Sequence, residues 1–309
     1  MEVLIIRGGA LGDTLMLLPA LSAVSKGVEI TFVGRAPGLW FMKGYVAVCM
    51  DLDRSGWHRL FQSADAGGAL PVGHAHRVIA FFADQTGGVH RNLEAFLPHA
   101  VIYTFPSFPP RDAAVHTARY VAQCLCDAGL PLDADAALEN SRRHPLIQTG
   151  PPEMGQQHTV FHPGSGDPKK NHPPQWWCRL MHEFSAPSAE TGTGRILLLG
   201  PAEEHLLPLF KACLEGSNTL LVWCPSTEQL TRLLREARLF IGHDSGVTHL
   251  SAMLGTPTVA LFKGTDPVQW GPLGPGVRVI TRPSPDERLI RAVQEAALFL
   301  SECDAEANP

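Results

Sequence analysis

The sequence predicts an α/β protein with two domains, each built around a parallel sheet. Short apolar runs typical of strands alternate with amphipathic helical segments along the chain. Strands joined in this way pair in parallel through right-handed crossovers. The chain has 309 residues, which is more than one hydrophobic core usually supports. We therefore expect one domain in residues 1–150 and a second in residues 151–284, followed by a closing helix.

The first domain begins with a strand–helix–strand unit. The strand EVLIIR leads into a glycine-rich turn, then into the helical pattern TLMLLPALSAVSK, and that helix leads into the strand EITFVGR. The runs RVIAFFAD and AVIYTF continue the sheet. VHTARYVAQCLCDAGL reads as an amphipathic helix with a glycine stop signal.

The second domain follows the segment 144–158, where Pro, Gly and Gln residues without apolar periodicity are typical of a linker. Strands and helices then alternate again. The expected strands are TVFHPG, RILLLG, TLLVWC, RLFIGHD, PTVALF and RVIT. The chain closes with a helix expected over residues 285–303.

The composition limits the classes of protein to consider. A hydrophobic fraction of 45% with 18% charged residues is typical of a globular chain, and a net charge of −5 argues against a general nucleic-acid binder. Seven cysteines without a C-x-x-C pair indicate reduced cytosolic thiols and no cysteine-based metal site. No signal-peptide pattern and no apolar run of ~20 residues is present, so we expect a soluble protein.

The first motif is RGGALGDTLMLLPAL, which follows the first strand. Gly8, Gly9 and Gly12 let the backbone turn tightly and approach a ligand. Asp13 lies near the start of the following helix, where a carboxylate serves either as an N-cap or as a general base. The G-x-G-x-x-G pattern of dinucleotide-binding proteins is missing, and so is the acidic residue that would bind a ribose.

The second motif is VFHPGSGDPKKNHP. Ser165 and Gly166 are small enough for backbone N–H groups to approach an anion, and Lys170 supplies positive charge. This combination predicts a phosphate site. The alternative is an ordinary solvated loop, because the order of residues differs from that of a Walker A loop.

The third motif is FIGHDSGVTHLSAMLGTPTVALF. Its polar turn enters a helix, and a helix N-terminus offers unpaired N–H groups and a partial positive charge to an anion. A plain N-cap would account for Asp244 alone. Four further residues place several hydrogen-bond donors on one side of the turn and favour phosphate binding; they are Ser245, Gly246, Thr248 and His249. His74 and His76 form a further polar pair, for which metal binding is the less favoured interpretation.

Together the three motifs resemble glycosyltransferase family 9, the ADP-heptose:lipopolysaccharide heptosyltransferases. The resemblance implies a GT-B architecture, in which two Rossmann-like domains with parallel sheets face a central cleft. It further implies that the N-terminal domain binds the acceptor and that residues 151–284 bind the nucleotide-sugar. The final helix, residues 285–303, is expected to pack back on the first domain.

The resemblance also implies roles for single residues. Asp13 matches the catalytic base, Lys170 matches the lysine that contacts the donor phosphates, and the loop with Gly9 and Gly12 lies on the acceptor side. The remaining donor-binding positions implied by it are Ser165, Gly166, Glu203, Asp244, Ser245, Gly246, Thr248 and His249. Two positions depart from the family pattern, with His172 in place of Trp and His243 in place of Asn.

The implied function is inverting transfer of a heptose or related sugar from an ADP-sugar to a hydroxyl of a saccharide or lipid-linked saccharide. This would belong to the synthesis of lipopolysaccharide core or another surface glycan, in the cytoplasm or at the cytoplasmic face of the inner membrane. No metal or other cofactor is expected. A GT-B-like nucleotide-sugar epimerase, a non-catalytic nucleotide-sugar-binding protein and a dinucleotide oxidoreductase stay open as alternatives.

Overall fold

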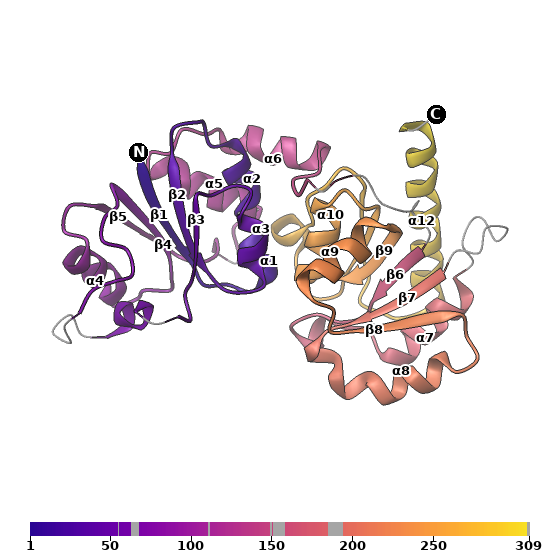
Figure 1. Cartoon of the computed structure of the whole chain (residues 1–309). Coiled ribbons are helices and arrows are strands. Elements are labelled where there is room, and N and C mark those ends of the chain that lie inside the picture. The colour runs from indigo at the N-terminus through magenta and orange to yellow at the C-terminus, as the bar shows by residue number, and fades with distance from the viewer. Residues whose placement is uncertain are drawn as a thin grey trace. The chain divides into compact units, whose positions relative to one another are not determined.

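The chain forms two compact units, Met1–Asn140 and Ser141–Pro309 (Figure 1). The computed structural model describes residues 1–54, 56–62, 68–110, 112–148, 150, 158–184 and 194–307. The division between the units comes before the boundary expected at residue 150. The expected linker, 144–158, lies partly outside the described residues, but its beginning docks on the second unit, where Leu146 and Ile147 donate backbone N–H groups to the carbonyl oxygen of Met253.

The first unit contains one parallel sheet with the strand order β3-β2-β1-β4-β5. Its strands are β1 (Glu2–Arg7), β2 (Glu29–Gly34), β3 (Val48–Asp51), β4 (Arg77–Phe81) and β5 (Val101–Phe105). Its helices are α1 (Leu11–Leu15), α2 (Leu18–Ala23), α3 (Gly38–Met42), η1 (Trp57–Phe61), α4 (Gly88–Phe96), α5 (Thr117–Asp127) and α6 (Ala134–Arg143), the last of which crosses the division. Strand β1 is central and almost wholly buried, as expected for an apolar run in a parallel sheet.

The second unit contains a parallel sheet with the strand order β11-β10-β9-β6-β7-β8. Its strands are β6 (His158–His162), β7 (Gly194–Leu199), β8 (Thr219–Trp223), β9 (Ala237–His243), β10 (Thr258–Phe262) and β11 (Val277–Thr281). Its helices are η3 (Pro168–Lys170), α7 (Pro174–Glu183), η4 (Pro201–Leu206), α8 (Leu207–Leu214), α9 (Thr227–Arg235), α10 (Gly246–Met253), α11 (Pro267–Trp270) and α12 (Glu287–Ala307).

Both sheets have the strand order of a Rossmann fold when the strands are numbered within each unit. The order reverses beside the first strand, between β1 and β4 in one unit and between β6 and β9 in the other. Ligands of such sheets bind beyond the carboxyl ends of the strands at this reversal. The loops that follow β1, β6 and β9 therefore lie where a ligand is expected, and these loops carry the three motifs.

Helix α12 packs on the second unit. Its buried residues Leu289, Ile290 and Val293 belong to the same hydrophobic cluster as Trp177 and Leu180 of α7. Its buried apolar residues thus belong to the second unit's own core, and the packing of this helix on the first domain stays a prediction. The repeat of apolar residues predicted an amphipathic helix, but periodicity does not identify which surface that helix covers.

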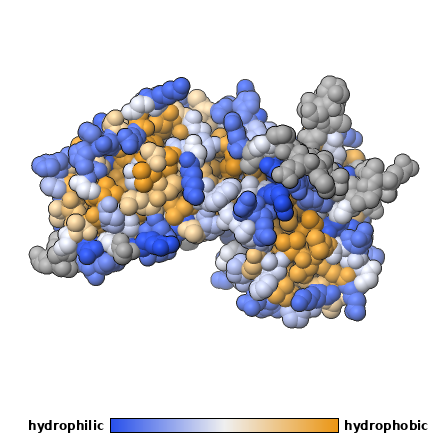
Figure 2. Space-filling view, viewed as in Figure 1, coloured by the Kyte–Doolittle hydropathy of each residue, from blue (hydrophilic) through white to orange (hydrophobic). Residues whose placement is uncertain are grey.

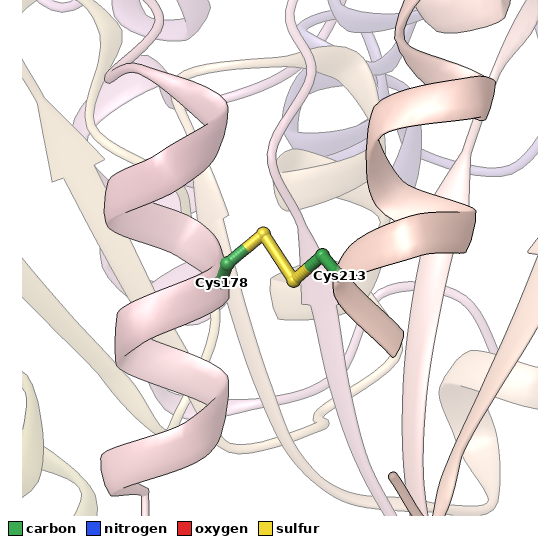
Figure 3. The surroundings of a disulfide bond; sticks show 2 residues. All are labelled: Cys178 and Cys213. Carbon is green, nitrogen blue, oxygen red and sulfur yellow. A yellow bond between two sulfur atoms is a disulfide. The ribbon is translucent and has the colours of Figure 1, made fainter. Parts of the chain in front are cut away.

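A disulfide bond joins α7 to α8 (Figure 3). Cys178 and Cys213 are bonded, with their Cα atoms 6.1 Å apart and a sequence separation of 35. This corrects the expectation that all seven cysteines are reduced thiols. No spacing pattern predicts this pair, because the two residues meet only through the packing of neighbouring helices.

The surface carries apolar residues among polar ones on each unit (Figure 2). On the second unit the edge strand β8 exposes Leu220 and Trp223. Within the described ranges, no helix combines the length and the apolar character needed to cross a membrane.

Candidate functional site

Asp13 lies in the short helix α1, directly beyond the carboxyl end of β1. Its Oδ2 atom accepts the backbone N–H of Ala10 at 3.0 Å, which satisfies one unpaired amide at the helix start. Gly9 makes this turn feasible, because a Cβ added there would lie 2.4 Å from the Cβ of Asp13. The carboxylate is thus half-exposed and held by a single described hydrogen bond, which is compatible with both interpretations of this residue.

A pocket of about 390 Å³ opens beside Asp13 within the first unit. Residues from the ends of β1 and β4 line it, as the reversal of strand order predicts. The full lining is Arg7, Gly8, Gly9, Asp13, Arg35, Leu52, Phe61, Phe81, Phe82, Ser107 and Phe108. Gly9 therefore takes the place expected for it, while Gly12 lies inside α1 and is not among these lining residues.

Arg7 is a residue of this pocket for which the sequence had predicted no role. It is 1% exposed, its Nε atom donates to the carbonyl oxygen of Asp13 at 3.0 Å, and its guanidinium group lies 5.0 Å from the ring centre of Phe81. Burial lowers the pKa of Arg7 to about 10, against the opposing charge of Asp13, so the group is still a cation at neutral pH. The signal that could have identified it is a charged residue at the end of the apolar strand VLIIR.

The turn after β9 holds a buried carboxylate with three polar neighbours. Asp244 is 5% exposed; its Oδ2 atom accepts from Lys170 Nζ at 2.9 Å and from Thr265 Oγ1 at 2.7 Å. His249 Nε2 lies 3.7 Å from Oδ1. Burial alone would raise the pKa of Asp244, but His249, Thr265 and Lys170 together outweigh it and lower this pKa from 3.8 to about 2.

Helix α10 begins in the same turn. Ser245 is its N-cap, and Ser245 Oγ accepts the N–H of Thr248 at 3.3 Å. Thr248 is buried and donates its hydroxyl to the carbonyl oxygen of His243, while His249 is buried beside Asp244. These two side chains hold the turn together instead of facing outward. The anion-binding capacity expected here therefore rests on the amides of the helix start, including that of Gly246, and on Lys170.

The loop after β6 lies next to this turn because β6 and β9 are paired strands. Ser165 is buried, and its Oγ lies 2.8 Å from the carbonyl oxygen of Asp167 and 2.7 Å from Asn171 Oδ1. Gly166 is exposed with open space around it. The loop then continues into η3, which ends at Lys170.

Glu203 lies at the start of η4, after β7. It is buried, and its Oε2 atom accepts the N–H of Gly200 at 2.8 Å. A Cβ added to Gly164 would lie 2.2 Å from the carboxyl carbon of Glu203. The structure thus brings Glu203 against the loop that contains Ser165 and Gly166.

The two departures from the family pattern are in contact with each other. The ring centres of His172 and His243 lie 5.0 Å apart, and His243 Nε2 accepts the backbone N–H of His172 at 2.9 Å and the indole N–H of Trp177 at 3.2 Å. Burial lowers the pKa of His243 to about 3, helped by His172, and lowers that of His172 to about 4. Both rings are therefore neutral and buried beneath the turn, where they support it.

Thr265 is a second residue of the site for which the sequence predicts no role. It follows β10 and donates to Asp244. The neighbouring Lys263 donates from Nζ to the carbonyl oxygen of Asn171 at 2.9 Å. The loop after β10 thus contacts both the turn that contains Asp244 and the loop after β6. Thr265 begins the stretch TDPVQWGPLG, and no spacing rule connects this stretch to Asp244.

Comparisons with known proteins place these features in a family. The family model described as "Glycosyltransferase family 9 (heptosyltransferase)" matches residues 103–293. Lipopolysaccharide heptosyltransferase 3 of Escherichia coli is 32% identical over 80 residues, which make up 25% of this chain and 24% of that protein. The chain thus matches about a quarter of the length of this curated relative.

Solved structures resemble the whole chain. The E. coli heptosyltransferase WaaC with ADP has a TM-score of 0.69 at 18% identity, and the match covers 97% of this chain and all of that chain. The E. coli ADP-heptose lps heptosyltransferase II has a TM-score of 0.70 at 16% identity, covering 99% and 100%. Identities this low establish a shared fold alone, and the fold class expected from the sequence is confirmed.

Proposed function

The chain belongs to glycosyltransferase family 9, and we propose that it transfers a heptose or a related sugar from an ADP-sugar to a hydroxyl group of a saccharide acceptor. The observation that carries this proposal is the contact between Lys170 and Asp244, at 2.9 Å, beside the N-terminus of α10. The Lys170 ammonium group lies at the reversal of strand order, and together with the amides of the adjacent helix start it has the chemistry to hold a diphosphate. The presence of ADP in the similar WaaC structure supports the choice of nucleotide.

On the donor side, Lys170 and the amides at the start of α10 would stabilise the negative charge that develops on the leaving diphosphate. Asp244 would orient the Lys170 ammonium group through the hydrogen bond between them. Ser165, Gly166 and Glu203 would line the adjacent loop, where the nucleoside is the expected occupant. Because Lys170 and the helix start already supply positive charge, we propose that the transfer needs no metal ion.

On the acceptor side, Asp13 would take the proton from the attacking hydroxyl group. The hydroxyl oxygen would then form a bond to the anomeric carbon as the bond to the diphosphate breaks, which inverts the configuration. The buried guanidinium group of Arg7 donates to the carbonyl oxygen of Asp13 and would help to hold this residue in position. The polar and aromatic lining of the pocket suits a saccharide.

The relatives' names support the finer assignment. Lipopolysaccharide heptosyltransferase 3 acts on lipopolysaccharide by its name, so we propose a saccharide of lipopolysaccharide core, or of another surface glycan, as the acceptor. A lipid-linked acceptor would bring the protein to the cytoplasmic face of the inner membrane. The absence of a described membrane-spanning helix fits a peripheral contact there.

The test combines donor binding with transfer. Calorimetry with ADP-, UDP- and GDP-sugars should show the tightest binding for the ADP-sugar. Asp13→Asn should lower kcat about 10²–10⁴-fold, the usual contribution of a general base, while ADP affinity changes by no more than a few-fold. Asp112→Asn, at an exposed aspartate of the same unit, is the matched control. Transfer by Asp13→Asn near the parent rate would refute the assignment of the base, and sugar conversion without an acceptor would indicate an epimerase.

A further inference from the structure

A second polar cluster lies at the opposite end of the first unit's sheet, at the start of β1. Glu2 Oε2 lies 3.3 Å from His74 Nε2 and 3.6 Å from His76 Nδ1. The three potential ligand atoms all lie within 4.8 Å of one another, and all three side chains are exposed. Neither the family assignment nor the proposed transfer reaction uses them.

The backbone holds these residues in place. His76 donates its N–H to the carbonyl oxygen of Glu2 at 3.0 Å, and Glu2 donates its N–H to His76 Nδ1 at 3.2 Å. The next positions, Val3 and Arg77, are paired in the parallel ladder of β1 and β4. Glu2 therefore lies at the start of the central strand β1, and hydrogen bonds to Glu2 hold His76 of the segment before β4 beside it.

We propose that Glu2, His74 and His76 form a binding site for Zn²⁺. Two imidazoles and one carboxylate are a ligand set that Zn²⁺ uses, with bonds of about 2.0–2.1 Å and a fourth position open to water. Ligand atoms in a tetrahedral site with such bonds are separated by about 3.3 Å. The distances of 3.3 and 3.6 Å from Glu2 to the two rings match this separation.

Two adjustments accompany binding. The exposed rings of His74 and His76 must move closer together, and His76 Nδ1 must exchange the N–H of Glu2 for the ion. A small cavity of about 230 Å³ adjoins the cluster and is lined by Glu2, His74, Glu29 and Thr31, among others. It offers space for the water ligand, and the carboxylate of Glu29 adds negative charge that favours a cation.

The site would link the first residue of β1 to the segment that precedes β4. Glu2 and Arg7 are the first and last of the six residues of β1, which places the ion roughly 17 Å along the strand from the pocket at the carboxyl end. The ion would therefore stabilise the first unit without taking part in transfer. Failure of this proposal would leave the proposed function untouched.

Titration of the tag-free, full-length protein with Zn²⁺ alone tests the site. By calorimetry the parent should bind one more equivalent than His74→Ala and His76→Ala, and Zn²⁺ should raise the Tm of the parent but not of these variants. Glu2→Gln should lower the affinity of this site for Zn²⁺ at least ~10-fold, in line with the loss of one ligand. His99→Ala, at an exposed histidine of the same unit, is the matched control and should behave like the parent.

Co²⁺ provides an independent readout, because a tetrahedral complex has strong visible absorption that an octahedral aquo ion lacks. The parent should show this spectrum, and His74→Ala should not. The proposal is overturned if the parent and both histidine variants, each folded by circular dichroism, bind equal numbers of Zn²⁺ ions. It is also overturned if His99→Ala removes the same equivalent.

Discussion

Replacing Lys170 with Met should weaken ADP binding about 100-fold (about 2.8 kcal/mol). The substitution keeps the length and apolar stem of the side chain but removes the ammonium group that lies 2.9 Å from Asp244. It leaves Thr265 on the Asp244 carboxylate, so the turn after β9 keeps a hydrogen bond. The change therefore acts on the charge at the site more than on the fold.

The magnitude follows from the hydrogen bonds of the ammonium group. Lysine has three N–H donors, and one of them is occupied by Asp244 within the part of the chain that the structure describes. Two are left for phosphate oxygens. At about 1.5 kcal/mol for each charge-assisted bond, the lower end of the usual range, their loss amounts to about 3 kcal/mol.

Calorimetric titration with ADP measures this loss directly. Lys169→Met is the matched control, because Lys169 is the preceding residue of the same η3 turn and is exposed. The double variant Lys170→Met/Asp244→Asn separates two effects: if Lys170 served only to neutralise Asp244, the second substitution would restore the affinity. We expect no such recovery.

The reasoning is refuted if Lys170→Met binds ADP within about threefold of the parent, since the predicted difference is about 30 times larger. It is equally refuted if Lys169→Met loses as much affinity as Lys170→Met. The loss would then reflect general surface charge and not the position of one ammonium group.

Two further predictions concern stability. Reducing the disulfide between Cys178 and Cys213, which are 35 positions apart, should lower the free energy of unfolding by about 4 kcal/mol. Urea titrations with and without reductant would measure this difference. Equal free energies of unfolding in the two titrations would contradict the prediction. Burial lowers the pKa of His243 from 6.5 to about 3. Its stabilising contribution is therefore complete above pH 6.5 and is lost as the pH falls from 6.5 towards 3. The loss in the free energy of unfolding amounts to about 2–3 kcal/mol at pH 4.5. His243→Asn should therefore lose less stability than the parent between pH 7 and 4.5, and identical pH profiles would show that this ring is not the cause.

Much of the fold was predictable because parallel sheets have a strong local signal. A run such as VLII in β1 is buried on both faces, and such continuous apolar runs bounded by glycine-rich turns identify central strands. Strand β3 was missed for the converse reason. It is a four-residue edge strand whose positions are exposed or half-buried, so its sequence, VCMD, lacks the apolar character of a core strand.

The candidate site was predictable as separate motifs but not as an assembled site. Local chemistry identified Asp13, Lys170 and Asp244 as candidates. The contact between Lys170 and Asp244 depends on the pairing of β6 with β9, which residues so far apart in sequence do not reveal. The burial of Arg7 was unpredictable for the same reason, because it depends on packing against Phe81 of β4.

Each unit has its own hydrophobic core, which includes Leu4 and Val78 in the first unit and Trp177 and Val293 in the second. Everything that holds Lys170 beside Asp244 is consequently encoded in one uninterrupted stretch of gene, including α12 at its far end. Under the proposed function, donor recognition is inherited as a single block. A recombination near residue 140 between two relatives would then transmit it whole, and new pairings of sugar with acceptor could arise by exchange of halves instead of by gradual substitution.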